Sequence, residues 1–138
     1  MLLALAAALL LAGFIAPASA APSQGTRAVV LSLTGPLTPA QATYLERAIG
    51  RAEQDQAEVV ILQLNTPGGQ IELMQKMVTL IRGSSVPVVV FVAPLQAMAG
   101  SAGTVITLAG WAAAMTPESI IGAASPVGGQ GENLDSTM

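Results

Sequence analysis

The feature that most constrains the fold is a regular alternation between short apolar, β-branched runs and longer segments with helical periodicity. Residues 27–33, 58–64 and 87–92 predict strands, and the second run is apolar almost throughout, as in a strand covered on both faces of a parallel sheet. Residues 38–56 and 70–82 predict the helices between them. This order predicts an α/β domain of repeated βαβ units with a mainly parallel sheet and right-handed crossovers.

The first helix has a recognisable start. Thr38 is followed by Pro39 and Gln41. This is the pattern of a capping box with proline at the first helical position, where the threonine hydroxyl accepts from the Gln41 amide and the glutamine side chain reaches back. A helix beginning at this point is therefore predicted.

The second half of the sequence contains shorter elements. Small residues at 97–103 lead into a short apolar helix that ends near Gly110. Two short strands are predicted to follow at 112–115 and 120–124.

Composition excludes several functions. The 138 residues are 52% hydrophobic and 9% charged, which suits one domain with a sizeable core. A net charge of −3 with five basic residues makes nucleic acid a poor partner. The absence of cysteine and histidine excludes thiol catalysis, disulfides and a Ser-His-Asp triad. We expect neither a metal nor a cofactor.

The two ends of the sequence predict that the protein is exported and that its domain continues beyond residue 138. Residues 2–16 are apolar or glycine, and small residues reach Ala20, so we expect a signal peptide over 1–20 and a domain over 21–138. An uncleaved anchor and a buried N-terminal helix stay open as alternatives. At the other end, residues 128–138 contain no closing element, so we expect the domain to be incomplete at its C-terminus.

Two glycine-containing turns follow predicted strands. Thr66–Gly69 comes after the second strand and Gly100–Gly103 after the third, and ligands bind at such strand ends in open parallel sheets. Both turns are expected to face one cavity. Because Gly68 and Gly69 have no side chains, their amides could approach a substrate carbonyl as closely as an oxyanion hole requires. A tight strand-to-helix connection is an equally simple explanation of the Pro-Gly-Gly sequence.

Ser101 is the candidate nucleophile. It lies among alanines and glycines, so its hydroxyl is open to a bulky acyl group, and a helix N-terminus favours developing negative charge. Serine is also a common N-cap residue, which is the alternative interpretation.

These motifs together resemble a family. TGPLTPA at 34–40, LNTPGG at 64–69, VVVFVAP at 88–94, AGSAGT at 99–104 and IGAASPV at 121–127 look like the protease domain of long-form NfeD proteins. Those proteins are membrane-bound serine proteases of the ClpP class. The resemblance runs from about residue 27 to 138 and implies the ClpP/crotonase fold.

The resemblance also implies site residues. It implies a Ser-Lys dyad with Ser101 as nucleophile, and it implies Gly69, together with Gly68, and the Ala102 amide as oxyanion donors. In the family the base is a lysine that would lie a few residues beyond the end of this sequence. Lys76 is the single lysine here, and we expect it to be a solvated surface residue.

The expected function is therefore a membrane-associated serine endopeptidase that cleaves apolar peptide segments of membrane or stomatin-like proteins. The family adds C-terminal membrane-spanning helices and a small β-barrel, so membrane contact is expected through spans outside this sequence. We expect an exported, periplasmic homo-oligomer. The alternative is a non-catalytic crotonase-like scaffold that binds a membrane partner. An acyl-CoA-processing relative is disfavoured, because CoA is intracellular and the sequence predicts export.

Overall fold

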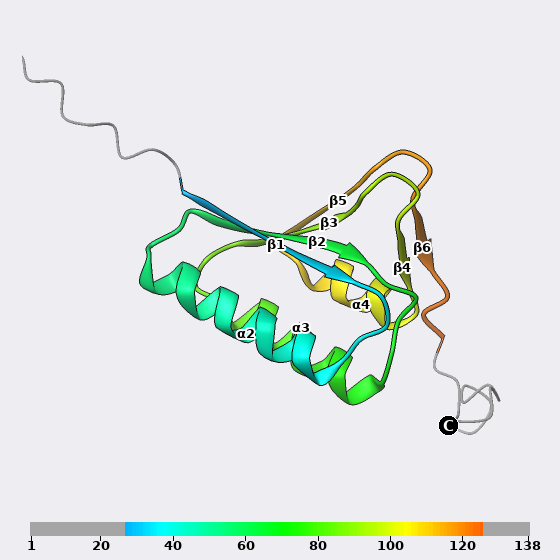
Figure 1. Ribbon diagram of the computed structural model, residues 1–138, viewed down its shortest axis with the longest axis horizontal. Coiled ribbons are helices and arrows are strands. Elements are labelled where there is room, and N and C mark those ends of the chain that lie inside the picture. The colour runs from blue at the N-terminus through cyan, green and yellow to red at the C-terminus, as the bar shows by residue number, and fades with distance from the viewer. Residues whose placement is uncertain (1–26, 126–138) are drawn as a thin grey trace, which may run out of the picture.

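Four parallel strands form the main sheet of the computed structural model, which describes residues 27–125 (Figure 1). The sheet order is β1-β2-β3-β5, and every neighbouring pair is parallel, which confirms the predicted sheet. The strands are β1 (Ala28–Thr34), β2 (Val59–Asn65), β3 (Val88–Val92) and β5 (Ala112–Met115). The predicted signal peptide and the residues after 125 lie outside the described part.

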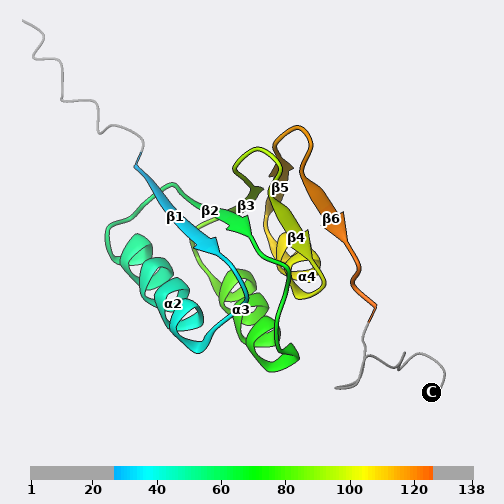
Figure 2. The ribbon, with the colours of Figure 1, turned by 45° about the vertical axis from the view of Figure 1, so that its right-hand side comes forward.

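Three helices connect these strands: α2 (Pro39–Gln54), α3 (Ile71–Gly83) and α4 (Ala102–Ala109). In a sheet whose strands follow sequence order, crossovers of one hand place every helix on the same face. Figures 1 and 2 show all three helices on one side of the main sheet.

The expectation that β2 is covered on both faces does not hold among residues 27–125. Its residues alternate between buried and half-buried along the strand. Val60, Leu62 and Leu64 are fully buried beneath the helices, whereas Ile61 and Gln63 point to the less covered face. The apolar run therefore predicted the strand correctly. Within residues 27–125, however, only one face of this strand is fully covered.

The core lies between the main sheet and the helices. Burying one leucine or isoleucine side chain contributes about 1.5–3 kcal/mol relative to exposure, so this layer dominates the favourable side of folding. Its largest fully buried members are Leu33, Leu62, Leu64, Val90, Leu45, Met77 and Ile106.

A second, two-stranded sheet is the main departure from prediction. β4 (Met98–Gly100) pairs in parallel with β6 (Ile120–Gly122), so the segment expected only to lead into a helix forms a strand first. The pairing is long-range, and short runs of small residues carry no periodicity that reveals it. In Figure 2 both strands lie beside the start of α4.

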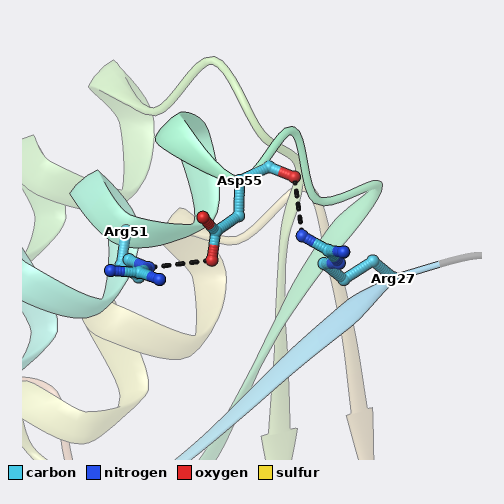
Figure 3. Close-up of polar contacts among 3 residues, drawn as sticks. All are labelled: Arg27, Arg51 and Asp55. Atoms are coloured by element: carbon cyan, nitrogen blue, oxygen red, sulfur yellow. Dashed lines mark hydrogen bonds and ion pairs between the residues drawn. The ribbon is translucent and has the colours of Figure 1, made fainter.

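The end of α2 is tied to the start of β1. Figure 3 shows Arg51 Nε donating to an Asp55 carboxylate oxygen at 2.8 Å, while Arg27 Nη1 donates to the Asp55 carbonyl at 3.3 Å. The hydrogen bond to Asp55 raises the pKa of Arg51 above its usual value, and the negative charge of the Asp55 carboxylate adds a smaller effect in the same direction. Such exposed pairs contribute little to stability, so their role is mainly to fix this connection.

Apolar side chains are exposed near β5 and β6. Trp111 is 84% exposed, Leu108 is 68% exposed and Ile120 is 59% exposed.

Within residues 27–125, no helix has both the length and the apolar character needed to cross a membrane.

The predicted capping box of α2 is present and can be tested. Thr38 Oγ1 accepts from Gln41 N at 3.3 Å, and Gln41 Oε1 accepts from Thr38 N at 3.0 Å. Replacing Thr38 with alanine should lower the free energy of unfolding by about 1 kcal/mol in urea titration, because one N-terminal amide loses its acceptor.

Thr43→Ala is the matched control. Thr43 is an exposed threonine in the same helix, and its hydroxyl donates only to the Pro39 carbonyl one turn earlier, at 3.1 Å. Alanine is the better helix former, so this variant should be neutral or slightly stabilising. Equal losses in both variants would contradict the capping account.

Candidate active site

Hydrogen bonds join the two glycine-containing turns. Thr66 N donates to the Met98 carbonyl at 2.6 Å, and Gly100 N donates to the Thr66 carbonyl at 2.9 Å. These two hydrogen bonds form an isolated parallel bridge between Thr66 and Ala99. The carboxyl end of β2 is thus attached to β4, and this brings the Pro-Gly-Gly turn beside Ser101.

Gly68 occupies the tightest point of this junction. Its φ of +114° lies in a region that side chains rarely adopt, and an added Cβ would lie 2.8 Å from the Ser101 Cβ. Its amide donates to Thr66 Oγ1 at 3.1 Å. Gly68 therefore shapes the turn, and its own N–H is already engaged inside it.

Gly69 is the exposed member of the pair. Among the described residues, its amide has no hydrogen-bond acceptor. A Cβ at Gly69 would lie 2.7 Å from the Leu37 Cβ, so the loop before α2 excludes a side chain here. The two glycines thus have different roles: Gly68 needs its backbone conformation, and Gly69 needs space.

Ser101 lies between β4 and α4 in a strained conformation. Its φ is 50° and its ψ is −117°, values that cost a non-glycine residue about 1–3 kcal/mol. Its amide donates to the Gly122 carbonyl at 2.8 Å, and its side chain makes no capping hydrogen bond. The capping alternative therefore does not describe this serine, which is a half-buried residue whose hydroxyl does not bind the helix end.

Ala102 is the first residue of α4. Its amide belongs to the first turn of the helix, whose N–H groups have no partner within the helix and carry partial positive charge. Elsewhere in the described chain no acceptor for this amide is found. A Cβ at Gly68 would lie 3.3 Å from the Ala102 nitrogen, so the amide borders the same junction.

Gly69, Ser101 and Ala102 line one cavity of about 220 Å³, so the two turns do face a common space. The remaining wall is mostly apolar and comes from three elements: the start of α3, the middle of α4 and the segment after β6. These residues are Ile71, Met74, Val105, Ala124 and Ser125. Within residues 27–125, none of the lining residues is titratable, so this part of the lining offers no base for the proton of Ser101.

Lys76 does not line the cavity and so cannot accept the Ser101 proton there. Its ammonium pairs with the Glu46 carboxylate at 2.9 Å, and both side chains are about half exposed. The prediction that Lys76 is a surface residue is confirmed. Glu118 likewise accepts from the Gln96 amide at 3.1 Å and does not line the cavity.

Two buried threonines were not identified from the sequence. Thr66 organises the Pro-Gly-Gly turn through its hydroxyl, and Thr104 contacts the end of β6. A threonine two residues before a glycine is a known turn pattern, so Thr66 had a detectable signal. The contact of Thr104 with Gly122 had none, because Gly122 lies in a strand 18 residues away.

The fold places the chain in a class and the sequence places it in a family. An asparagine-to-aspartate mutant of ClpP1 from Listeria monocytogenes superposes with a TM-score of 0.59 at 22% identity, covering 75% of this chain and 58% of that one, so the fold is ClpP-like. Residues 29–138 match the family model described as NfeD1b, N-terminal domain. The chain belongs to this family.

Relatives with higher sequence identity are named as proteases. The membrane-bound protease PH1510 of Pyrococcus horikoshii is 40% identical over 104 residues, which are 75% of this chain and 24% of that protein. A lysine-to-alanine mutant of the 1510-N membrane-bound stomatin-specific protease, solved with a substrate peptide, has a TM-score of 0.73 at 36% identity. That match covers 80% of this chain and 52% of the solved one. The chain thus spans about a quarter of the curated relative.

The packing at Gly68 can be tested by substitution. Gly68→Ala should lower the free energy of unfolding by about 2 kcal/mol or more, because a side chain at positive φ is strained and must also displace Ser101. Urea unfolding measures the loss.

Gly50 is the matched glycine. It lies inside α2, and an added Cβ there would meet nothing within 4 Å. Gly50→Ala should therefore stabilise the protein by about 0.4–1 kcal/mol. Wild-type stability in Gly68→Ala would contradict the described junction.

Proposed function

We propose that this chain carries the nucleophile of a membrane-associated serine endopeptidase. The observation that carries the proposal is the strained Ser101, at φ 50°, beside the amides of Gly69 and Ala102 on a common cavity. Strained backbone persists where the surrounding structure enforces it, and it gathers at active sites. A nucleophile exposed on a sharp strand-to-helix turn is a recurrent arrangement in hydrolases.

In the proposed reaction, Ser101 Oγ attacks a peptide carbonyl. The new C–O bond forms as the carbonyl oxygen takes up negative charge, and the Gly69 and Ala102 amides donate to that oxygen. Gly68 holds the turn, since its own amide is engaged with Thr66. As the C–N bond breaks, the leaving amine takes the proton that the base accepted from Ser101. Water, which gives a proton to the same base, then hydrolyses the acyl-enzyme and frees Ser101.

The serine proton requires a base, and we propose a lysine that follows residue 138 in the whole protein. Among residues 27–125, the absence of any titratable group from the cavity lining supports a base outside that part of the chain. So does the relative that was solved as a lysine mutant with its substrate peptide. A lysine can accept a proton near neutral pH only when burial or nearby positive charge lowers its pKa.

The proposed substrate is an apolar peptide segment of a membrane or stomatin-like protein. Ile71, Met74 and Val105 give the cavity apolar walls, which would favour an aliphatic side chain over a charged one. The relative named as stomatin-specific supports the choice of protein.

We also propose the cellular setting. Residues 1–20 act as a signal peptide, residues 21–138 belong to the protease domain, and the domain works on the periplasmic face. Membrane attachment comes from other parts of the whole protein. A homo-oligomer is supported by exposed apolar side chains such as Trp111, which are typical of surfaces that contact protein.

An activity assay tests the proposal. Full-length protein should cleave a fluorogenic apolar peptide, and Ser101→Ala should lower kcat by at least about 10³-fold. Residues 21–138 alone should show no measurable cleavage, because a serine hydroxyl without a base is a weak nucleophile.

Ser125→Ala is the matched control. Ser125 lines the same cavity but has no role in the proposed bond-making and bond-breaking steps, so its loss should change kcat no more than a few-fold. Loss of activity in Ser125→Ala with retention in Ser101→Ala would overturn the assignment. Failure of wild-type, full-length protein to cleave peptide or react with a serine-directed phosphonate would instead favour the non-catalytic scaffold.

A further inference from the structure

Thr104 is a buried threonine three residues after Ser101, and its hydroxyl contacts two elements at once. Thr104 Oγ1 lies 2.8 Å from the Ala99 carbonyl, 2.7 Å from the Gly122 carbonyl and 3.0 Å from the Gly122 amide. One hydroxyl has a single proton, so it donates to one of the two carbonyls while it accepts from the Gly122 amide. The hydroxyl therefore links β4, through Ala99, to the end of β6 at Gly122.

Gly122 is also the partner of the Ser101 backbone. The Ser101 amide donates to the Gly122 carbonyl at 2.8 Å, and the Thr104 amide donates to the Ser101 carbonyl at 3.0 Å. Ser101, Thr104 and Gly122 thus form a closed ring of hydrogen bonds. Within this ring the Thr104 hydroxyl is the only side-chain group, and it holds the end of β6 against the serine.

We propose that Thr104 is a positioning residue for Ser101. By pinning Gly122, its hydroxyl keeps Ser101 in its strained conformation and fixes the start of the segment that carries Ala124 and Ser125 along the cavity wall. The catalytic consequence rests on the proposed function, whereas the structural coupling does not. Thr104 touches no reacting atom, so its effect must pass through Gly122 and Ser101.

Removing the hydroxyl should loosen the ring without removing its apolar packing. In Thr104→Val the shape is nearly kept, but the part-buried Gly122 amide loses its acceptor. The expected effect is about a tenfold shift in the local opening equilibrium. Thr104→Ser keeps the hydroxyl and should restore the ring. Thr104→Cys keeps a weak donor and should give a smaller effect in the same direction.

Thr107 provides a matched control on the same helix. It is 2% exposed, and its hydroxyl donates only to the Gly103 carbonyl at 2.8 Å, within the helix region. Thr107→Val therefore removes another buried hydroxyl, one that does not contact β6. Any difference between the two valine variants isolates the contact with Gly122.

The first measurement is amide hydrogen exchange in the full-length protein. Thr104→Val should speed exchange at Ser101 and Gly122 by about tenfold or more, while amides of β1, β2 and β3 stay as in the wild type. Thr104→Ser should resemble the wild type and Thr107→Val should leave both amides unchanged. Should Thr104→Val not fold, Thr104→Cys gives the same comparison.

The second measurement is kinetic. Thr104→Val should lower kcat and the rate of Ser101 labelling by a phosphonate about 10–100-fold with KM within threefold, and Thr104→Ser should recover most of both. Exchange rates and kcat in Thr104→Val that match Thr107→Val would overturn the proposal. If wild-type protein lacks activity, the proposed function fails, and hydrogen exchange alone still decides whether Thr104 controls Ser101.

Discussion

The pairing of Thr66 with strand β4 is the interaction on which the rest of the site depends. Two backbone hydrogen bonds, which together form a parallel bridge between Thr66 and Ala99, attach the end of a core strand to a second, smaller sheet. Without this attachment, the turn at Gly68 and the turn at Ser101 would belong to separate layers. Because Thr66 is fully buried, its contacts are shielded from water and hold both turns in one geometry.

Strain at Ser101 is the cost of presenting a serine hydroxyl at the end of a strand. A residue at φ 50° is unfavourable by itself, so neighbouring contacts must keep it there. Its backbone hydrogen bond to Gly122 and the close fit of Gly68 supply that constraint. Departures from local preference at one residue, surrounded by regular structure that tolerates it, are typical of functional sites.

Local signals in the sequence predicted most of the regular structure and the two turns. β-branched runs indicated β1, β2 and β3, and the capping box indicated the start of α2, because these features depend on neighbouring residues alone. β4 and the ring around Thr104 were missed, since both depend on pairing with β6 across about 20 residues. The separate roles of Gly68 and Gly69 were equally hidden, because Leu37 packs against Gly69 from another loop.

The role of Ser101 is tested most directly by a crystal structure of the full-length protein after reaction with a peptidyl phosphonate. We expect a covalent bond to Ser101 Oγ, with a phosphonyl oxygen about 2.7–3.1 Å from the amides of Gly69 and Ala102. Adduct formation at another residue, or a Ser101 adduct whose oxygens all face solvent, would contradict this role.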